Sequence, residues 1–260
     1  MPRFAANLSM MFQEMPFLDR FAAARAAGFE AVEFLFPYDF PAAEIAARLK
    51  DNGLQQVLFN APPGDWAAGE RGMACIPGRQ GEFREALKTA LDYTAALSCP
   101  RLHIMPGLRP AGVAHDTLTA VYGANLAWAA EECAKAGVKA VIEPINQRDI
   151  PGIFMTTMQQ GADIIAAVGE DRLGLQFDLY HCQVSEGDIV KRVEKHLPII
   201  AHMQVADVPG RNEPGTGEVN WPFVFSRIDA LGYRGWIGCE YRPAGETVAG
   251  LGWFAPYKAA

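Results

Sequence analysis

Four apolar segments in the second half of the chain each end in a side chain that carries oxygen. The endings are Ile142-Glu143, Phe177-Asp178, Met203-Gln204 and Cys239-Glu240. A single carboxylate after a strand is usually solvated, but four such endings in succession are not expected by chance. If these segments are parallel strands of one barrel, their carboxyl ends meet at one mouth and the four side chains converge.

Converging carboxylates predict a bound cation. In a partly dry pocket their mutual repulsion would raise at least one pKa, whereas a divalent ion would hold all of them ionised. Carboxylate and amide oxygens suit Mg²⁺ or Mn²⁺ better than Zn²⁺. We therefore expect one such divalent ion to be ligated by Glu143, Asp178, Gln204 and Glu240.

A second polar layer is expected just below these ligands, because side chains on a strand alternate between its two faces. Two residues before Asp178 and Gln204, this alternation points Gln176 and His202 into the barrel. We expect His202 to hydrogen bond to Gln176 and to support the ligands from below. Direct ligation of the metal by His202 is the alternative.

Five further side chains could bind a substrate at the same mouth. His181 lies just beyond one of the expected ligands, in the loop that we expect to lead into the next helix, and His103 lies within another apolar segment. Arg71, Arg211 and Arg242 lie where loops would follow strands, so each could neutralise an anionic group. The alternatives are a buried structural histidine and arginines that are merely solvated.

The elements that would position these residues alternate between strand and helix. Eight segments have strand length and apolar character: residues 4–8, 31–36, 56–60, 102–105, 138–143, 173–178, 199–205 and 236–240. Segments with helical spacing of apolar residues lie between them. Repeated strand and helix units predict a parallel sheet, and eight of them predict closure into an α/β fold, the (β/α)8 TIM barrel. We expect residues 1–260 to form a single domain, with a long functional loop over residues 61–80.

Length and charge agree with a barrel and disfavour several partners. The chain has 260 residues, close to the roughly 250 of one such barrel. Its formal net charge of -7 argues against nucleic acid and anionic membranes as partners. The five cysteines include no C-x-x-C pair and no signal peptide or membrane span is expected, which favours a cytoplasmic protein. Homo-oligomerisation is left open.

Characteristic nucleotide and protease motifs are missing from the sequence. It contains no Walker loop, no dinucleotide fingerprint and no G-x-S-x-G elbow. We therefore expect neither a nucleotide nor a redox cofactor.

Several sequence blocks resemble the xylose isomerase-like barrel superfamily and, within it, the hydroxypyruvate isomerase family. The blocks are NLSMMF (7–12), EFLFPY (33–38), residues 60–79, FDLYH (177–181), GTGEVN (215–220), GCEY (238–241) and GLGWF (250–254). The resemblance covers essentially the whole chain. It implies that Glu143 and Glu240 are the proton-transferring pair, and that both hold the divalent ion together with Asp178 and Gln204.

Two differences from other members of the superfamily disfavour two of the activities found in it. Related ketose 3-epimerases have His where this chain has Gln204, which disfavours an epimerase. Endonuclease IV, another relative by fold, has a His-rich multi-zinc site and a basic surface. Five histidines and a net charge of -7 supply neither feature.

The resemblance further implies a reaction, the interconversion of hydroxypyruvate and 2-hydroxy-3-oxopropanoate (tartronate semialdehyde) through an enediolate. One glutamate would remove a proton, the metal would stabilise the enediolate, and either glutamate would return the proton to the neighbouring carbon. The substrate would be a small anionic hydroxy-oxo acid whose carboxylate we expect Arg71 to bind, with Arg211 and Arg242 as alternatives. Three other functions stay open: a 2-oxo-tetronate isomerase of the same family, a ketose 3-epimerase and a non-catalytic sugar-binding barrel.

Overall fold

Eight parallel strands form a closed barrel in the computed structural model, which describes residues 1–258. The strands are β1 (Arg3–Asn7), β2 (Ala31–Glu33), β3 (Gln55–Asn60), β4 (Arg101–His103), β5 (Lys139–Ile142), β6 (Leu173–Asp178), β7 (Ile200–Gln204) and β8 (Trp236–Cys239). They pair in chain order, and β8 closes the ring on β1. The expected (β/α)8 TIM barrel is therefore confirmed.

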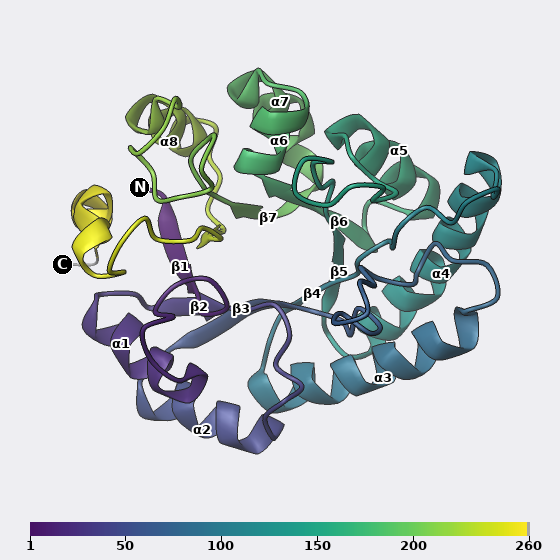
Figure 1. Cartoon of the computed structure of the whole chain (residues 1–260), viewed down its shortest axis with the longest axis horizontal. Coiled ribbons are helices and arrows are strands. Elements are labelled where there is room, and N and C mark those ends of the chain that lie inside the picture. Colours follow the sequence, from purple (N-terminus) through teal and green to yellow (C-terminus); the bar gives the residue numbers. More distant parts are fainter. Residues whose placement is uncertain (259–260) are drawn as a thin grey trace.

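Helices surround this ring (Figure 1). They are α1 (Arg20–Ala26), α2 (Ala42–Asp51), α3 (Gln80–Leu97), α4 (His115–Lys135), α5 (Met158–Val168), α6 (Leu179–Ser185), α7 (Ile189–His196) and α8 (Trp221–Ala230), with the 3-10 helices η1 (Phe17–Asp19), η2 (Leu197–Ile199) and η3 (Ala249–Tyr257). Each longer helix buries a stripe of apolar side chains against the strands, as Phe83 and Leu87 of α3 do. None of the helices in the described part of the chain is long and apolar enough to span a bilayer.

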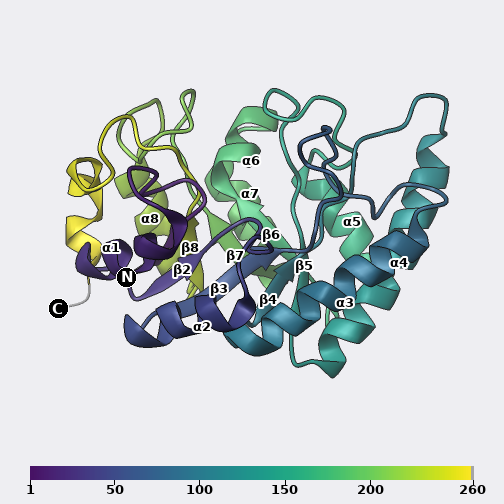
Figure 2. The same ribbon diagram turned by 60° about the horizontal axis from the view of Figure 1, so that its bottom comes forward.

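The strands carry a buried apolar cluster, and the long loops lie at one end of the barrel. Small and apolar side chains form the cluster, among them Ala5, Ala31, Val57 and Val141. The long loops that follow the strands gather at the carboxyl end of the barrel, at the top of Figure 2. Since active sites of such barrels lie at this carboxyl end, the loops enclose the place where the predicted site residues should meet.

The helix α6 was not expected, because the sequence predicts only a loop between β6 and α7. Asp178 starts this short helix by accepting hydrogen bonds from the backbone N–H groups of Tyr180 (2.7 Å) and His181 (3.3 Å). His181 therefore lies in the first turn of a helix and is rigidly placed. His196 is buried at the end of α7.

Candidate functional site

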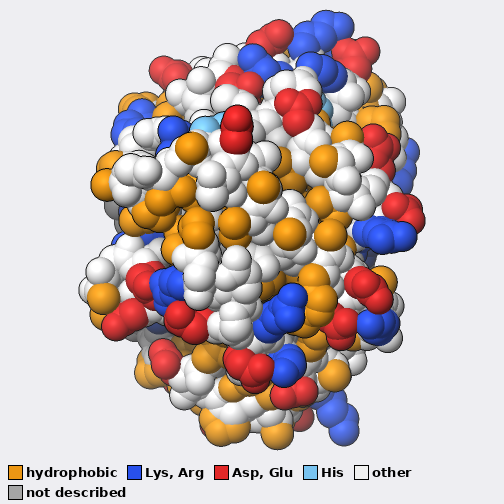
Figure 3. All heavy atoms as spheres, turned by 90° about the vertical axis from the view of Figure 1, so that its right-hand side faces the viewer, with side chains coloured by type: hydrophobic (Ala, Val, Ile, Leu, Met, Phe, Trp, Pro, Cys, Tyr) orange, Lys and Arg blue, Asp and Glu red, His pale blue; other side chains and the backbone are white. Residues whose placement is uncertain are grey.

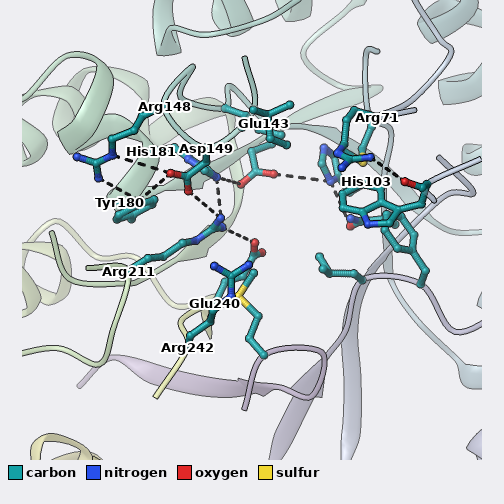
Figure 4. Close-up of a pocket in the computed structure, with 18 of the residues that line it drawn as sticks. Arg71, His103, Glu143, Arg148, Asp149, Tyr180, His181, Arg211, Glu240 and Arg242 are labelled. Atoms are coloured by element: carbon teal, nitrogen blue, oxygen red, sulfur yellow. Dashed lines mark hydrogen bonds and ion pairs between the residues drawn. The ribbon is translucent and has the colours of Figure 1, made fainter. Parts of the chain in front are cut away.

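A cavity of about 530 Å³ opens at the carboxyl end of the barrel (Figure 4). Seven of the predicted site residues line it: Arg71, His103, Glu143, His181, Arg211, Glu240 and Arg242. Asp178, Gln176, His202 and Gln204 are buried in the barrel and carry no more than 1% exposed surface. The structure thus brings the predicted residues together, as a cavity wall and a polar layer within the barrel.

Two carboxylate oxygens in this group lack a hydrogen-bond partner among the described residues. They are Oε1 of Glu143 and Oδ2 of Asp178, and both are fully buried. Buried charged oxygens are normally paired or ligate a metal. Glu143, Asp178 and His181 also offer ligand atoms that lie within 4.8 Å of one another. The donor set therefore fits a divalent cation, and the chemistry of its oxygens fits a hard one.

Burial dominates the electrostatics of the carboxyl groups. Burial and the neighbouring carboxylates of Glu240 and Asp178 hold the pKa of Glu143 well above its usual range. Burial raises the pKa of Glu240 to about 8 and that of Asp178 to about 6, although the guanidinium of Arg211 opposes both shifts. Without a cation, these groups keep protons that exposed carboxyl groups would release.

We expect the metal-free protein to lose stability as the pH rises from the ordinary carboxyl pKa of 4.5 to the raised value of about 8 at Glu240. Over this range the folded state binds more protons than the unfolded state, so the free energy of unfolding falls with pH. A bound metal ion replaces these protons, so the stabilisation by Mn²⁺ should grow over the same range. Melting temperatures with EDTA and with Mn²⁺ across this pH range measure both effects.

The Glu240→Gln variant is the matched control for this titration. Its metal-free melting temperature should depend less on pH, because one of the raised carboxyl groups is gone. A Mn²⁺-induced shift of melting temperature that is the same at every pH would contradict the expectation.

Gln204 presents its amide nitrogen to the carboxylates. The nitrogen donates to Oε1 of Glu33 (2.8 Å) and to Oε2 of Glu240, while the Gln204 oxygen accepts from Gln176 (2.6 Å). An amide ligates a cation through its oxygen. Metal ligation by Gln204 stays a prediction, and in the present arrangement Gln204 orients Glu240.

Glu33 is the residue that the sequence-based prediction of the site missed. Its carboxylate is fully buried and accepts hydrogen bonds from Asn7 (2.9 Å), His202 (2.7 Å) and Gln204 (2.8 Å). It lies at the end of β2, just as Glu143 follows β5. In the sequence, however, Glu33 and Asn7 lie inside the segments expected to be strands, 31–36 and 4–8, so of these polar residues only Asn60, at the end of 56–60, carried the signal of a strand end.

The expected hydrogen bond between His202 and Gln176 is wrong. His202 bonds to Glu33 across the barrel, and Gln176 bonds to Gln204 instead. Gly238 makes room for this arrangement, because a Cβ at that position would collide with the Glu33 carboxylate. We predicted that His202 supports the expected ligands above it. This role stays a prediction, and the contact between His202 and Glu33 favours it.

Arg211 reaches into the carboxylate cluster. Its Nη2 lies 2.7 Å from Oε1 of Glu240 and 3.9 Å from Oδ2 of Asp178, while its Nη1 donates to Asp149 (3.0 Å). Although burial opposes its charge, these carboxylates raise the pKa of Arg211. Arg211 thus supplies a fixed positive charge at the centre of the site.

Asp207 shapes the loop that carries Arg211. Its two carboxylate oxygens accept hydrogen bonds from four backbone N–H groups, those of Val208, Gly215, Gly217 and Val219. Its backbone also pairs with the N–H of Arg211 and the oxygen of Asn212. A buried carboxylate that accepts this many hydrogen bonds fixes the course of the chain, and sequence spacing alone gave no sign of it.

Arg71 and Arg242 line other parts of the cavity. The guanidinium of Arg71 stacks on Trp66 at 3.7 Å from the ring centroid and donates to the backbone oxygens of Trp66 and Glu70. Among the described residues, neither Arg71 nor Arg242 forms an ion pair with a carboxylate. Both side chains therefore retain a charge that no described carboxylate neutralises.

His103 forms part of the opposite wall. Its Nδ1 lies 3.1 Å from Oδ1 of Asn60 and 3.8 Å from Oε2 of Glu143. Burial lowers the pKa of His103 to about 3, so the ring is neutral near pH 7. A neutral ring at this place can donate or accept a hydrogen bond without adding charge.

Comparisons with known proteins match the chain along almost its whole length. The family model described as xylose isomerase-like TIM barrel matches residues 21–257. A 2-oxo-tetronate isomerase from Cupriavidus necator is 55% identical over 257 residues, which are 99% of this chain and 99% of that protein. The hydroxypyruvate isomerase of Escherichia coli is 45% identical over 258 residues, which are 99% of this chain and 100% of that protein.

Solved structures match the chain to different degrees. One described as an AP endonuclease, family 2, from Brucella melitensis has a TM-score of 0.97 and 49% identity, over 100% of both chains. An L-ribulose 3-epimerase has a TM-score of 0.77 and 22% identity, over 94% of this chain and 82% of that chain. At this lower identity, the likeness supports the fold alone.

Proposed function

The chain belongs to the xylose isomerase-like TIM barrel family, and from this premise we propose that it isomerises a short hydroxy-oxo acid. The reaction moves one proton between adjacent carbons of the substrate and one between the oxygens that those carbons carry, as in an aldose–ketose isomerisation. The observation that carries the proposal is the pair of buried carboxyl groups, Glu143 and Glu240, at one cavity. Burial raises the pKa of both groups, that of Glu240 to about 8, so in the metal-free cavity each holds a proton more strongly than an exposed carboxyl group does, which suits groups that accept and return protons.

Each glutamate has neighbours that suit this role. Glu240 is held by Gln204 and Arg211, so its carboxylate has a fixed direction. Glu143 has His103 and His181 beside it at 3.8 and 3.9 Å, and one of its oxygens is free of hydrogen bonds from described residues. One glutamate removes a proton from the substrate carbon, and either returns it to the neighbouring carbon.

A divalent ion would be held by Glu143, Asp178, Gln204 and Glu240, with Mg²⁺ or Mn²⁺ matching the oxygen donors. Such an ion supplies Lewis-acid stabilisation of negative charge that develops on substrate oxygens. The guanidinium of Arg211 would help to stabilise the same negative charge. It lies in the site beside Glu240, with Nη2 2.7 Å from Oε1 of that residue.

Hydroxypyruvate is the first candidate substrate. Four arginines line the cavity, namely Arg71, Arg148, Arg211 and Arg242, and they suit an anionic substrate better than a neutral sugar. A cavity of about 530 Å³ admits a three-carbon acid together with ordered water. The 45% identical relative that is named hydroxypyruvate isomerase supports this choice.

The four-carbon acid 2-oxo-tetronate is the second candidate. The specific observation in its favour is the 55% identical relative named 2-oxo-tetronate isomerase. The same cavity and the same pair of glutamates would serve it, because the two acids differ by one hydroxymethylene group beyond the reacting carbons.

We expect turnover of at least one of these acids in the presence of Mn²⁺ or Mg²⁺, and none after removal of the metal by a chelator. An added or missing carbon unit in a pocket is worth roughly 1–3 kcal/mol, so kcat/KM should favour one acid by about 10- to 200-fold. The value of kcat/KM for each acid is measured with purified protein by a coupled reductase assay or by NMR. A lack of turnover of both acids with metal present would contradict the proposed function.

Other functions have less support. A nuclease of this fold needs a basic surface, whereas the net charge is -7 and basic and acidic side chains are interspersed on the face seen in Figure 3. A ketose 3-epimerase does not need the arginines that line this cavity. A barrel that only binds a sugar would not need two proton-exchanging glutamates.

A further inference from the structure

Asn146 follows Glu143 by three residues and is buried at 1% exposure beside the cavity. Its side-chain orientation is fixed, because its oxygen accepts a hydrogen bond from the backbone N–H of Asp149 at 2.8 Å. The amide nitrogen must then point the other way. It lies 2.6 Å from Nδ1 of His181.

A second donor of Asn146 also faces Nδ1 of His181. The backbone N–H of Asn146 also points at this nitrogen, at 3.4 Å. Because both groups are donors and neither can accept here, Nδ1 must be the acceptor. In a neutral imidazole the proton then lies on the other nitrogen, Nε2.

Nε2 of His181 is the ring atom that faces the site (Figure 4). It lies 3.7 Å from Oδ2 of Asp178, 3.9 Å from Oε1 of Glu143 and 3.4 Å from Nη2 of Arg211. The two carboxylate oxygens are too far for a direct hydrogen bond. The guanidinium also only donates, so its contact with Nε2 at 3.4 Å competes with this tautomer, but the 2.6 Å contact and the second donor at Nδ1 outweigh it. Nε2–H and Nη2 are then two donors that flank a position which one acceptor oxygen can fill.

We propose that Asn146 is a positioning residue that keeps His181 in the Nε2–H form, so that His181 donates to a substrate oxygen and does not ligate the metal. This rests on the proposed function as far as the substrate is concerned. A nitrogen that carries a proton has no lone pair for a cation, so the metal would be held by the carboxylates rather than by His181. The oxygen that receives the hydrogen bond is the one on which negative charge develops when a proton leaves the neighbouring carbon.

The tautomer is tested directly by ¹⁵N NMR of the histidine rings in the full chain, without substrate. We expect the His181 signals to show a protonated Nε2 and an unprotonated Nδ1. In Asn146→Asp, the oxygen that receives the Asp149 hydrogen bond is retained and the donor is replaced by an acceptor, so Nδ1 should become protonated. A protonated Nδ1 in the wild-type protein would overturn the proposal.

Metal affinity gives a second readout that does not depend on turnover. Because His181 is not a ligand in this proposal, His181→Ala should lower the Mn²⁺ affinity, measured by calorimetry, by no more than the roughly 10- to 100-fold that loss of a residue beside a metal ligand costs. A loss of more than about 100-fold would make His181 a ligand and overturn the proposal.

Kinetics test whether Asn146 acts through His181. We expect Asn146→Ala to lower kcat by about 10- to 100-fold, as the loss of a residue that orients a site histidine does. In the His181→Ala background the same substitution should cost less than about twofold, since the coupling is lost. Additive effects of the two substitutions would count against the proposal.

The control variant is Asn52→Ala, which removes an amide that donates to the backbone of Arg48 at the end of α2, on the outside of the barrel. It should leave kcat unchanged. If the wild-type protein turns over neither candidate acid, the proposed function fails, whereas the NMR and Mn²⁺ results still decide the state of His181.

Discussion

Replacing Glu240 with Gln is expected to lower kcat by about 10³-fold, because the variant keeps a side-chain oxygen but can no longer accept or return a proton. The substitution is nearly isosteric and removes a carboxyl group whose burial raises its pKa to about 8. The fold should therefore be retained, with a metal-free melting temperature at neutral pH no lower than that of the wild type. Steady-state kinetics with the preferred acid and a divalent ion measure the loss.

Hydrogen exchange in D₂O separates the roles of the two glutamates. If each faces one of the two reacting carbons, Glu240→Gln and Glu143→Gln should each still exchange the carbon-bound hydrogen of one isomer while failing to convert it. If one glutamate serves both carbons, one variant should keep both exchanges and the other should lose both. The exposed Glu131→Gln variant on α4 is the control and should behave as wild type.

Turnover by Glu240→Gln within about threefold of wild type would mean that Glu240 is structural. The two-glutamate mechanism would then be wrong. Metal content is measured in parallel, so that a loss of activity caused by a lost cation is distinguished from a loss of proton transfer.

The barrel and the convergence at its mouth could be predicted from the sequence because both depend on local patterns. Apolar segments of strand length define the strands, and a polar residue at the end of a segment marks the mouth. Asp178 and Glu240 were found in this way. Glu33 lacks this mark, because the expected segment 31–36 continues beyond it, and the register of β2 against β3 shifts between Val32 and Glu33, so simple alternation does not show that Glu33 faces inward.

Contacts across the barrel could not be predicted, because they depend on strand tilt rather than on spacing. His202 on β7 meets Glu33 on β2, a residue 169 positions away on a strand that does not neighbour β7. Alternation predicts that His202 points inward but not which side chain it meets. The helix α6 was missed for another reason, since Asp178 is both an expected ligand and the cap that starts the helix.

The charge balance of the cavity identifies where a substrate carboxylate would bind. Arg211 already pairs with Glu240 and Asp149, and Arg148 hydrogen bonds to Tyr180 and lies near Asp149. Arg71 and Arg242 are the cavity arginines without such carboxylate partners among the described residues. Arg71 is also held in place, since it stacks on Trp66, which in turn contacts Phe36 at 5.0 Å between ring centroids. A preoriented guanidinium loses little entropy when it binds a carboxylate.

We therefore expect Arg71→Ala to raise KM by an amount corresponding to about 2–4 kcal/mol, the cost of leaving a charge-assisted pair unmade in a closed site. The effect on kcat should be smaller, because Arg71 lies beside His103, away from Arg211 (Figure 4). Arg71→Lys should recover only part of the affinity, since an ammonium cannot pair with a carboxylate in two parallel hydrogen bonds. Arg84→Ala is the matched control, because Arg84 also lies over a tryptophan, Trp128, but on the outer helix α3. If KM for Arg71→Ala stays within about twofold of wild type, the carboxylate is bound by Arg242 or Arg211, and the corresponding alanine variants then identify which one.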